Sequence, residues 1–294
     1  MNSINWNRFD YRVNIDFFKR WIPQMAYILG FTFADGNVYK TVLAWDLKQD
    51  RELLERINQT MGSNYPIHKR KASFRLRISN PVVVNDLQNL GVYPNKSSSI
   101  QLPMVPPQLF SHFARGFFDG DGWIYIRESR NEISVGFSSG SEKFLSQLSN
   151  KITKTLDFTT NNLRTKSKIT GKGISSISYQ VDYFWENAYR VLTFLYGNLE
   201  NNDLFMERKY KQCKKAKELY EWVKSGGRKW RKIEREFQES MNRILTKFWR
   251  AGYNGPQIAD KLGVHHSSIY RWLIKTKVRP PFTEIRRRGV INDR

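Results

Sequence analysis

The chain has 294 residues, and its 49 Lys and Arg against 27 Asp and Glu give a formal net charge of +22. At roughly 100–200 residues per domain, this length predicts two or three domains. The single Cys213 excludes a disulfide framework, and four His residues are too few for a metal cluster. No apolar run reaches the ~20 residues that span a bilayer, so no membrane partner is expected. The charge indicates a polyanionic partner, for which nucleic acid is the first candidate.

The positive charge is concentrated toward the C-terminal end. Residues 226–294 hold 17 basic and 6 acidic side chains, which is half of the net excess. The dipeptide Gly226-Gly227, followed by the basic run 228–232, predicts a flexible joint before a separate tail module.

The first 225 residues contain an internal repeat. Segment 26–36 is echoed by segment 112–122, and both end in an Asp-Gly pair that includes Asp35 or Asp121. A repeat of this length indicates a duplicated domain. We therefore expect a first half at 1–110, a second half at 111–225, and a tail at 226–294.

Hydrophobic periodicity predicts the same order of elements after each repeat. In the first half we expect a strand at 38–45 and a helix at 50–61. A hairpin of 67–71 with 73–79 and a helix at 81–90 should follow. In the second half we expect strands at 123–127, 133–137, 163–168 and 177–184, and helices at 141–156 and 185–196, the first capped by Ser141. The order α-β-β-α-β-β-α, given twice, predicts an α+β fold with two related four-stranded sheets.

Each repeat is predicted to be a helix that ends at its Asp-Gly pair. Small residues four apart, Gly30 with Ala34 and Gly116 with Gly120, would let the two helices approach backbone to backbone. Gly36 and Gly122 would then occupy left-handed positions at the helix ends.

Two packed helices would bring Asp35 and Asp121 together at their C-terminal ends, where the helix dipole is also negative. Such a pair needs a cation. Hard carboxylates without His or Cys suit Mg²⁺ or a similar ion, with backbone carbonyls, water and phosphate oxygens completing the coordination. The alternative is that both residues only cap helices, but two copies in register argue against it.

Segments 28–36 and 114–122 resemble the LAGLIDADG motifs of homing endonucleases, in the single-chain form with two motifs. The flanking phrases 17–21 and 91–97 are also similar to that family. The resemblance covers about residues 15–215. It implies two pseudosymmetric halves that form a DNA-binding saddle, and a site-specific endonuclease that makes double-strand breaks by phosphodiester hydrolysis. It also implies that Asp35 and Asp121 bind Mg²⁺ or Mn²⁺, with Ala34 and Gly120 as the adjoining backbone donors.

Two lysines match the active-site lysines of that family, Lys96 in the first half and Lys209 in the second. The alternative for both is passive phosphate contact. The sixth motif position is Asp119 in the second copy but Phe33 in the first, which should weaken hydrogen bonding at the first helix end.

The strands suggest two DNA-facing sheets, because basic residues alternate with apolar ones. Alternating charge can also mean only a solvated face. The candidate DNA-binding residues on the sheets are Lys69, Lys71, Arg75, Arg77, Arg127, Arg164, Lys166 and Lys168.

The tail resembles a helix-turn-helix over residues 256–273, with Ala259 at the helix crossing and Gly263 at the turn. Ile269 would return to the core beside Ile258, Leu262 and Val264. The alternative is a small helical bundle that binds protein. The candidate DNA contacts of the tail are Ser267, Ser268, Tyr270, Arg271, Lys275 and Arg279.

Together these features predict a metal-dependent double-strand DNA endonuclease that acts inside the cell as a monomer, without an obligate protein partner. A non-cleaving DNA-binding regulator and an RNA maturase built on the same fold are the alternatives. A self-splicing intein is not expected, because neither end of the sequence carries a splice-junction nucleophile.

Overall fold

The computed structural model describes residues 10–94, 98–159, 162–170, 173–227, 229–264, 269 and 273. The chain divides into two compact units, Met1–Trp222 and Val223–Arg294. Among the described helices, none combines the length and the apolar character needed to cross a membrane.

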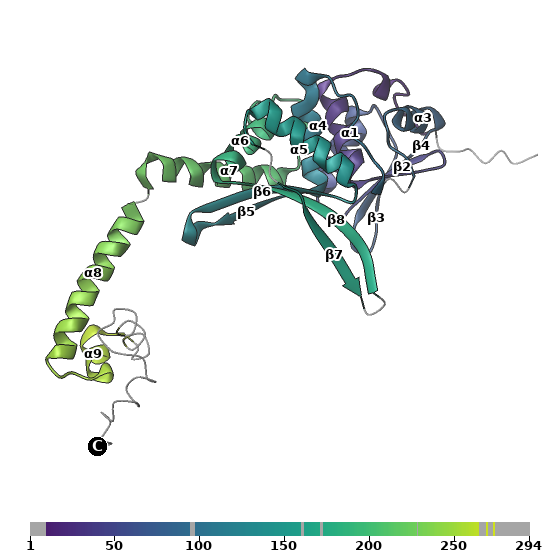
Figure 1. Ribbon diagram of the computed structural model, residues 1–294. Coiled ribbons are helices and arrows are strands. Elements are labelled where there is room, and N and C mark those ends of the chain that lie inside the picture. Colours follow the sequence, from purple (N-terminus) through teal and green to yellow (C-terminus); the bar gives the residue numbers. More distant parts are fainter. Residues whose placement is uncertain are drawn as a thin grey trace, which may run out of the picture. The chain divides into compact units, whose positions relative to one another are not determined.

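The first unit contains both repeats, each with the predicted order of helices and strands (Figure 1). The first repeat consists of α1 (Pro23–Asp35), β1 (Gly36–Tyr39), β2 (Val42–Leu47), α2 (Arg51–Thr60), β3 (Ile67–Lys69), β4 (Phe74–Ser79) and α3 (Pro81–Asn89). The second consists of α4 (Phe110–Asp121), β5 (Gly122–Arg127), β6 (Glu132–Ser139), α5 (Glu142–Leu156), β7 (Arg164–Thr170), β8 (Gly173–Phe184) and α6 (Trp185–Tyr196). A further helix, α7 (Glu207–Trp222), follows, and short 3₁₀ helices cover Phe17–Lys19, Pro107–Leu109 and Glu128–Arg130.

The expectation of one continuous strand over 38–45 is wrong. The chain forms a hairpin there, and Lys40 adopts a left-handed backbone with φ of 51° between β1 and β2. A tight reversal needs such a conformation, which a lysine adopts at a modest cost. The apolar alternation that suggested one strand belongs to two strands paired with each other, Tyr39 opposite Val42.

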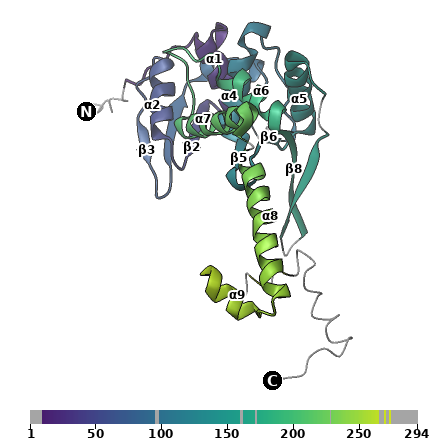
Figure 2. The same ribbon diagram turned by 90° about the vertical axis from the view of Figure 1, so that its left-hand side faces the viewer.

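The two sheets have the same strand order, β1-β2-β4-β3 and β5-β6-β8-β7, and all pairs are antiparallel. The helices of the unit lie over one face of the sheets (Figure 1). The sheets lie on either side of the central helices (Figure 2). In β2, Leu43, Trp45 and Leu47 point into the core and Asp46 is exposed. The α+β fold with two related four-stranded sheets is therefore confirmed.

Polar side chains fix the starts of two surface helices. The Asn80 side chain accepts hydrogen bonds from the backbone N–H groups of Val82 and Val83 at the start of α3. Ser141 accepts one from Phe144 at the start of α5, as predicted. Each such cap satisfies donors that the helix itself leaves unpaired, and typically contributes ~1 kcal/mol.

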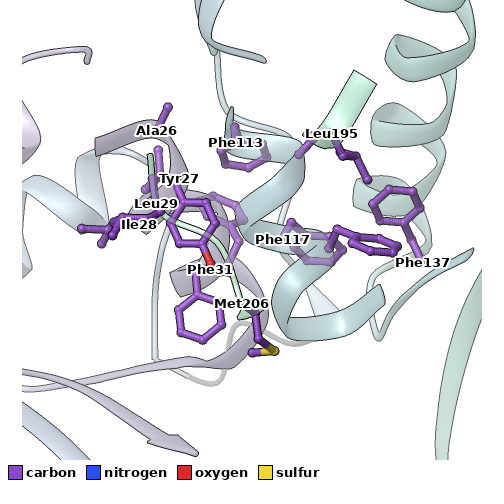
Figure 3. Close-up of a cluster of buried hydrophobic side chains, with 14 of the residues drawn as sticks. Ala26, Tyr27, Ile28, Leu29, Phe31, Phe113, Phe117, Phe137, Leu195 and Met206 are labelled. Carbon is purple, nitrogen blue, oxygen red and sulfur yellow. The ribbon is translucent and has the colours of Figure 1, made fainter. Parts of the chain in front are cut away.

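The central helix α1 is buried on all sides from Met25 to Phe33. Its neighbour α4 contributes Phe113 and Phe117 to the same cluster, and Leu195 of α6 and Met206 join them (Figure 3). A helix with no solvated face is a core element in a protein of this size. The two motif helices are thus the centre of the first unit.

The second unit begins with a kink, in which Gly226 adopts a left-handed backbone with φ of 99°, and contains α8 (Lys229–Arg250) and α9 (Gly255–Leu262). Asn254 and Gln257 form a reciprocal capping box at the start of α9, and Gly263 ends it with φ of 65°. The small core of this unit comprises Leu245, Ile258, Ala259, Ile269 and Leu273.

Three of the tail residues expected at the helix crossing, Ala259, Ile258 and Ile269, are buried together. Leu262 packs at the edge of this core. Val264 was expected there too, but it is 36% exposed. It directly follows the left-handed Gly263, where the chain turns out of α9, so its side chain points to solvent.

Candidate active site

Helices α1 and α4 touch backbone to backbone at two glycines. A Cβ atom on Gly30 would lie 2.0 Å from the carbonyl oxygen of Phe113, and one on Gly116 would lie 2.0 Å from that of Tyr27. These are reciprocal contacts, each helix using its glycine against the other's backbone. The predicted close packing of the two repeats is confirmed, because no side chain larger than hydrogen fits at either position.

The ends of both helices lie against each other as well. A Cβ on Gly120 would be 2.3 Å from the Cβ of Ala34 and 3.3 Å from Oδ2 of Asp35. The Asp35 carboxylate therefore lies beside the last turn of α4, against Gly120, which directly precedes Asp121 in the sequence.

The expected left-handed backbone at Gly36 and Gly122 is wrong. Their φ angles are −76° and −101°, in the extended region, because each helix runs directly into a strand. Glycine is needed there for space. A Cβ would lie 2.5 Å from Cγ2 of Thr32 at the first position and 2.1 Å from the ring of Phe118 at the second.

The two carboxylates differ in exposure, Asp35 being exposed and Asp121 half-buried. Both carboxylates act on the ammonium group of Lys209, where their negative charges oppose the lowering of its pKa by burial. A single lysine within electrostatic reach of both carboxylates is consistent with an acidic pair at the helix ends. Sequence reasoning placed Asp35, Asp121 and Lys209 together, and the structure brings all three to the same end of the helix pair.

Lys209 lies in the first turn of α7 and is almost completely buried. Its Nζ donates hydrogen bonds to the carbonyl oxygens of Phe118, at 2.5 Å, and Gly122, at 2.6 Å. These are carbonyls at the C-terminal end of α4, where a positive charge also interacts favourably with the helix dipole.

Burial, with a smaller contribution from the charge of Arg208, lowers the pKa of Lys209 to about 8, although Asp119, Asp35 and Asp121 oppose the shift. The lysine is therefore still charged near neutral pH. It can serve as a cation beside a phosphate, and it holds the end of α4 in place.

Asp119 is fully buried and accepts three hydrogen bonds, from the hydroxyls of Tyr27 (2.7 Å) and Tyr196 (2.6 Å) and from the N–H of Met206 (2.8 Å). Burial raises the pKa of Asp119, and the nearby Lys209 charge and these hydrogen bonds oppose that shift. The carboxylate thus joins α1, α4, α6 and the start of α7, which carries Lys209 at the end of α4.

Sequence reasoning missed Tyr27 and Tyr196 as partners of Asp119. Each is an aromatic residue in an apolar helical pattern, so nothing in the spacing separates it from an ordinary core residue. The first repeat has Phe33 where the second has Asp119. Phe33 packs against the rings of Phe113 and Phe144 and makes no equivalent polar network.

A buried ion pair anchors the segment between α6 and α7. Arg115 donates to the carbonyl oxygens of Leu195 and Leu204 and lies 3.3 Å from Oδ1 of Asp203. Burial alone would raise the pKa of Asp203, but the hydrogen bond from His112 and the charge of Arg115 lower it overall. This pair fixes the chain that leads into α7 and Lys209.

The basic residues predicted on the sheets divide into two groups. Arg75 is paired with Asp46 at 2.9 Å, Arg164 with Asp182, and Arg127 with Glu132 at 3.7 Å. The others whose side chains are described are exposed, and they are Lys69, Lys71, Arg77 and Lys166. By strand register, Arg77 and Lys166 lie on the outer faces of their sheets and could contact a polyanion there. Lys69 lies opposite Phe74, on the face that packs against the core, and Lys71 lies in the turn between β3 and β4.

Several predicted site residues lie outside the described residues or side chains. They are Lys96, Lys168, Ser267, Ser268, Tyr270, Arg271, Lys275 and Arg279.

Residues 111–191 match the family model of the LAGLIDADG-like domain. The matched segment begins in α4 and includes all four strands of the second sheet. The site at the end of α4 therefore lies at the start of a LAGLIDADG-like segment.

Two curated relatives, the probable translation initiation factors IF-2 of Methanocaldococcus jannaschii and Thermococcus kodakarensis, are each 29% identical over 133 residues, 42% of this chain. This chain spans about a tenth of the length of these relatives, since 11% of each is covered.

Among solved structures, the LAGLIDADG meganuclease I-AabMI bound to uncleaved DNA is 13% identical, with a TM-score of 0.45, covering 70% of this chain and 92% of that one. Mesophilic variants of the homing endonuclease I-DmoI are 11% identical, with a TM-score of 0.40, and the match covers 65% of this chain and 96% of that one. The N-terminal LAGLIDADG domain of DUF199/WhiA is 14% identical, with a TM-score of 0.38, and the match covers 72% of this chain and 100% of that one.

Proposed function

We propose that this chain is a site-specific DNA endonuclease that hydrolyses phosphodiester bonds in both strands of a duplex. The observation that carries the proposal is the meeting of α1 and α4. Their ends bring the Asp35 carboxylate against Gly120, next to Asp121, with the Lys209 ammonium acted on by both acids.

The residues present at this site fit a divalent cation such as Mg²⁺ or Mn²⁺. Asp35 and Asp121 supply hard oxygen donors, and the adjoining carbonyls of Ala34 and Gly120 are further candidates. Within the described residues, no group of three or more His, Cys, Asp or Glu side chains could hold a metal by itself. An ion at this place would thus complete its coordination with water and substrate phosphate oxygens, which is the usual arrangement for Mg²⁺. When bound, such an ion would lower the pKa of water and stabilise the charge of the departing oxygen.

Lys209 has a separate task in this proposal. An ammonium has three N–H donors, and two are used on the carbonyls of Phe118 and Gly122. In this proposal the third donates to a phosphate oxygen or an ordered water at the acidic pair. Because two hydrogen bonds fix Nζ, its charge would be in place before DNA binds, which lowers the cost of reorganisation.

Duplex DNA is the proposed substrate because basic residues follow the outer faces of both sheets and the tail carries half of the net charge. Both motifs belong to one chain, so a monomer would suffice for both strands. The tail would act as a helix-turn-helix that adds binding length, and the protein would work where the cell keeps its DNA.

The test begins with selection of bound duplexes from a randomised library, followed by incubation of the selected DNA with Mg²⁺. We expect double-strand cleavage by the wild type and none by the Asp35→Asn/Asp121→Asn double variant, which should still bind. Asp157→Asn is the matched control, because Asp157 is an exposed aspartate at the end of α5 and away from the acidic pair.

Continued cutting by the double variant would contradict the metal assignment. Tight, specific binding by the wild type without cleavage under any divalent cation would instead establish a DNA-binding regulator. Preference for a folded RNA over the selected duplex would point to the maturase alternative.

A further inference from the structure

The outer face of the second sheet carries three aromatic side chains, Trp123, Tyr125 and Phe184, which we call the aromatic patch. Tyr125 is 46% exposed and Phe184 60% exposed. Ser134 pairs with Tyr125 on one side and with Phe184 on the other, so the two rings lie in one row across three strands. With neighbouring strands about 4.8 Å apart, the two Cα positions are separated by roughly 10 Å.

Trp123 extends the patch by one row. Its partner in β6 is Gly136, and a Cβ added to that glycine would lie 2.2 Å from the indole ring. The ring therefore packs directly against Gly136 of β6. This is the kind of close approach for which a strand glycine is retained.

The corresponding row of the first sheet is different. Counting from Gly36 and Gly122, Tyr39 is the counterpart of Tyr125, and the row continues through Val42 to Ser79. A serine thus occupies the position that Phe184 has in the second sheet. The two sheets share a backbone arrangement and differ in the chemistry that they present at this point.

The surroundings of the aromatic patch are charged. The guanidinium of Arg127 lies 5.7 Å from the centre of the Tyr125 ring and 3.7 Å from the carboxylate of Glu132, and Arg164 pairs with Asp182 in the neighbouring row. Lys166 is exposed further along β7. An apolar patch with basic neighbours complements a polyanion that itself presents apolar groups, and duplex DNA is such a partner.

The major groove of DNA is ≈ 12 Å wide, and its one apolar feature is the C5 methyl group of thymine. A phenylalanine has no hydrogen-bonding group, so it distinguishes bases in the groove only through such a contact. A row of two rings roughly 10 Å apart fits within this width.

We propose that the aromatic patch reads thymine, with Phe184 and Tyr125 packing on C5 methyl groups in the half of the target that the second sheet contacts. The inference rests on the proposed DNA binding, and it deepens that function by naming the base that this surface selects. Ser79 gives the first sheet no equivalent contact.

The experiment uses the full chain and its selected duplex, with each thymidine replaced in turn by deoxyuridine, which lacks only the methyl group. Binding without cleavage is measured for the wild type and for Phe184→Ser, which gives the second sheet the residue of the first. Ser79→Ala is the matched control on the first sheet, and circular dichroism checks that all variants fold.

For the wild type we expect about a fourfold weaker binding per contacted methyl group, the equivalent of ≈ 0.8 kcal/mol. The same replacements should change the binding of Phe184→Ser by less than about twofold, while Ser79→Ala should respond as the wild type does. A Tyr125→Ala variant should lose the response at a neighbouring thymidine.

Wild-type binding that ignores every thymidine replacement would overturn the inference and leave the proposed DNA binding intact. An equal response in the wild type and Phe184→Ser would also overturn it, because the methyl groups would be read elsewhere. Failure to select any duplex would remove both the inference and the proposed function, so the two failures are distinguishable.

Discussion

The hydroxyl of Tyr27 on α1 donates a hydrogen bond of 2.7 Å to the buried carboxylate of Asp119 on α4. This bond joins the helix of the first repeat to the motif of the second. The same carboxylate accepts from the N–H of Met206, just before α7. The end of α4 and the helix that carries Lys209 are therefore tied to α1 through one acidic side chain.

Tyr27→Phe removes one donor from this carboxylate and leaves the ring in place. Hydrogen bonds to charged groups contribute ≈ 1.5–3 kcal/mol, and we expect a loss of stability in that range. Urea denaturation followed by circular dichroism measures it. Tyr39→Phe is the control, because its hydroxyl belongs to a ring that is 60% exposed, and it should be neutral. Equal effects of the two variants would argue against a stabilising role for the Asp119 network.

Gly116→Ala should destabilise the first unit by ~3 kcal/mol, at the upper end of the range for overpacking. Its Cβ would meet the backbone oxygen of Tyr27 at 2.0 Å, which can be relieved only by separating the helices. The direction of the change in stability is informative, because alanine stabilises a helix by ≈ 1 kcal/mol relative to glycine where no such contact exists. Lys143→Ala, at an exposed position of α5, should stay within about 0.5 kcal/mol. A stabilised Gly116→Ala variant in thermal denaturation would contradict the tight contact.

The pH dependence of stability should reveal the buried Lys209. Burial lowers its pKa to about 8 in the folded protein, from 10.5 in the unfolded chain. Between these values the unfolded chain binds more protons, so this lysine makes stability rise with pH. The cost of burying its charge is present below pH 8 and is relieved above it. We expect a contribution of about +1 kcal/mol between pH 8 and 9.

The measurement compares the wild type with Lys209→Met across this window. The comparison is needed because burial raises the pKa of Cys213 to about 12, so this thiol makes stability fall at higher pH. The difference between the two proteins isolates the lysine. A wild-type curve parallel to that of Lys209→Met would show that the lysine keeps an ordinary pKa.

Removal of residues 223–294 should leave the first unit folded, because that unit has its own large core. Binding of the selected duplex should weaken. The logarithm of the association constant should also fall less steeply with the logarithm of the salt concentration than it does for the full chain. The slope is ≈ −0.9 per phosphate neutralised, so its change counts the phosphate contacts of the tail. An unchanged slope in fluorescence-anisotropy titrations would show that the basic tail does not touch the DNA backbone.

The order of elements was predictable from the sequence because strands and helices leave different apolar periods. The predicted range of α6, 185–196, agrees with the structure, and β5 agrees within one residue. The turn at Lys40 was missed because a lysine carries no turn signal, and the left-handed conformation there is imposed by pairing of β1 with β2.

At the candidate site, the duplicated Asp-Gly pairs pointed to Asp35 and Asp121, because a duplicated pattern of glycine and aspartate has few structural explanations. Lys209 was proposed from the family resemblance. Its hydrogen bonds to Phe118 and Gly122 were not predictable, since 87 or more positions separate the partners.

The sequence by itself determined that two equivalent helices would pack through small residues and end in acids, since glycine spacing and charge are local properties. Only the tertiary structure decided which groups surround those acids. The ammonium of Lys209 comes from α7 to interact with both acids, and the neighbouring buried network joins the carboxylate of Asp119 to the hydroxyls of Tyr27 and Tyr196 from two further helices. Their burial sets their pKa values, and burial depends on every layer that packs above them.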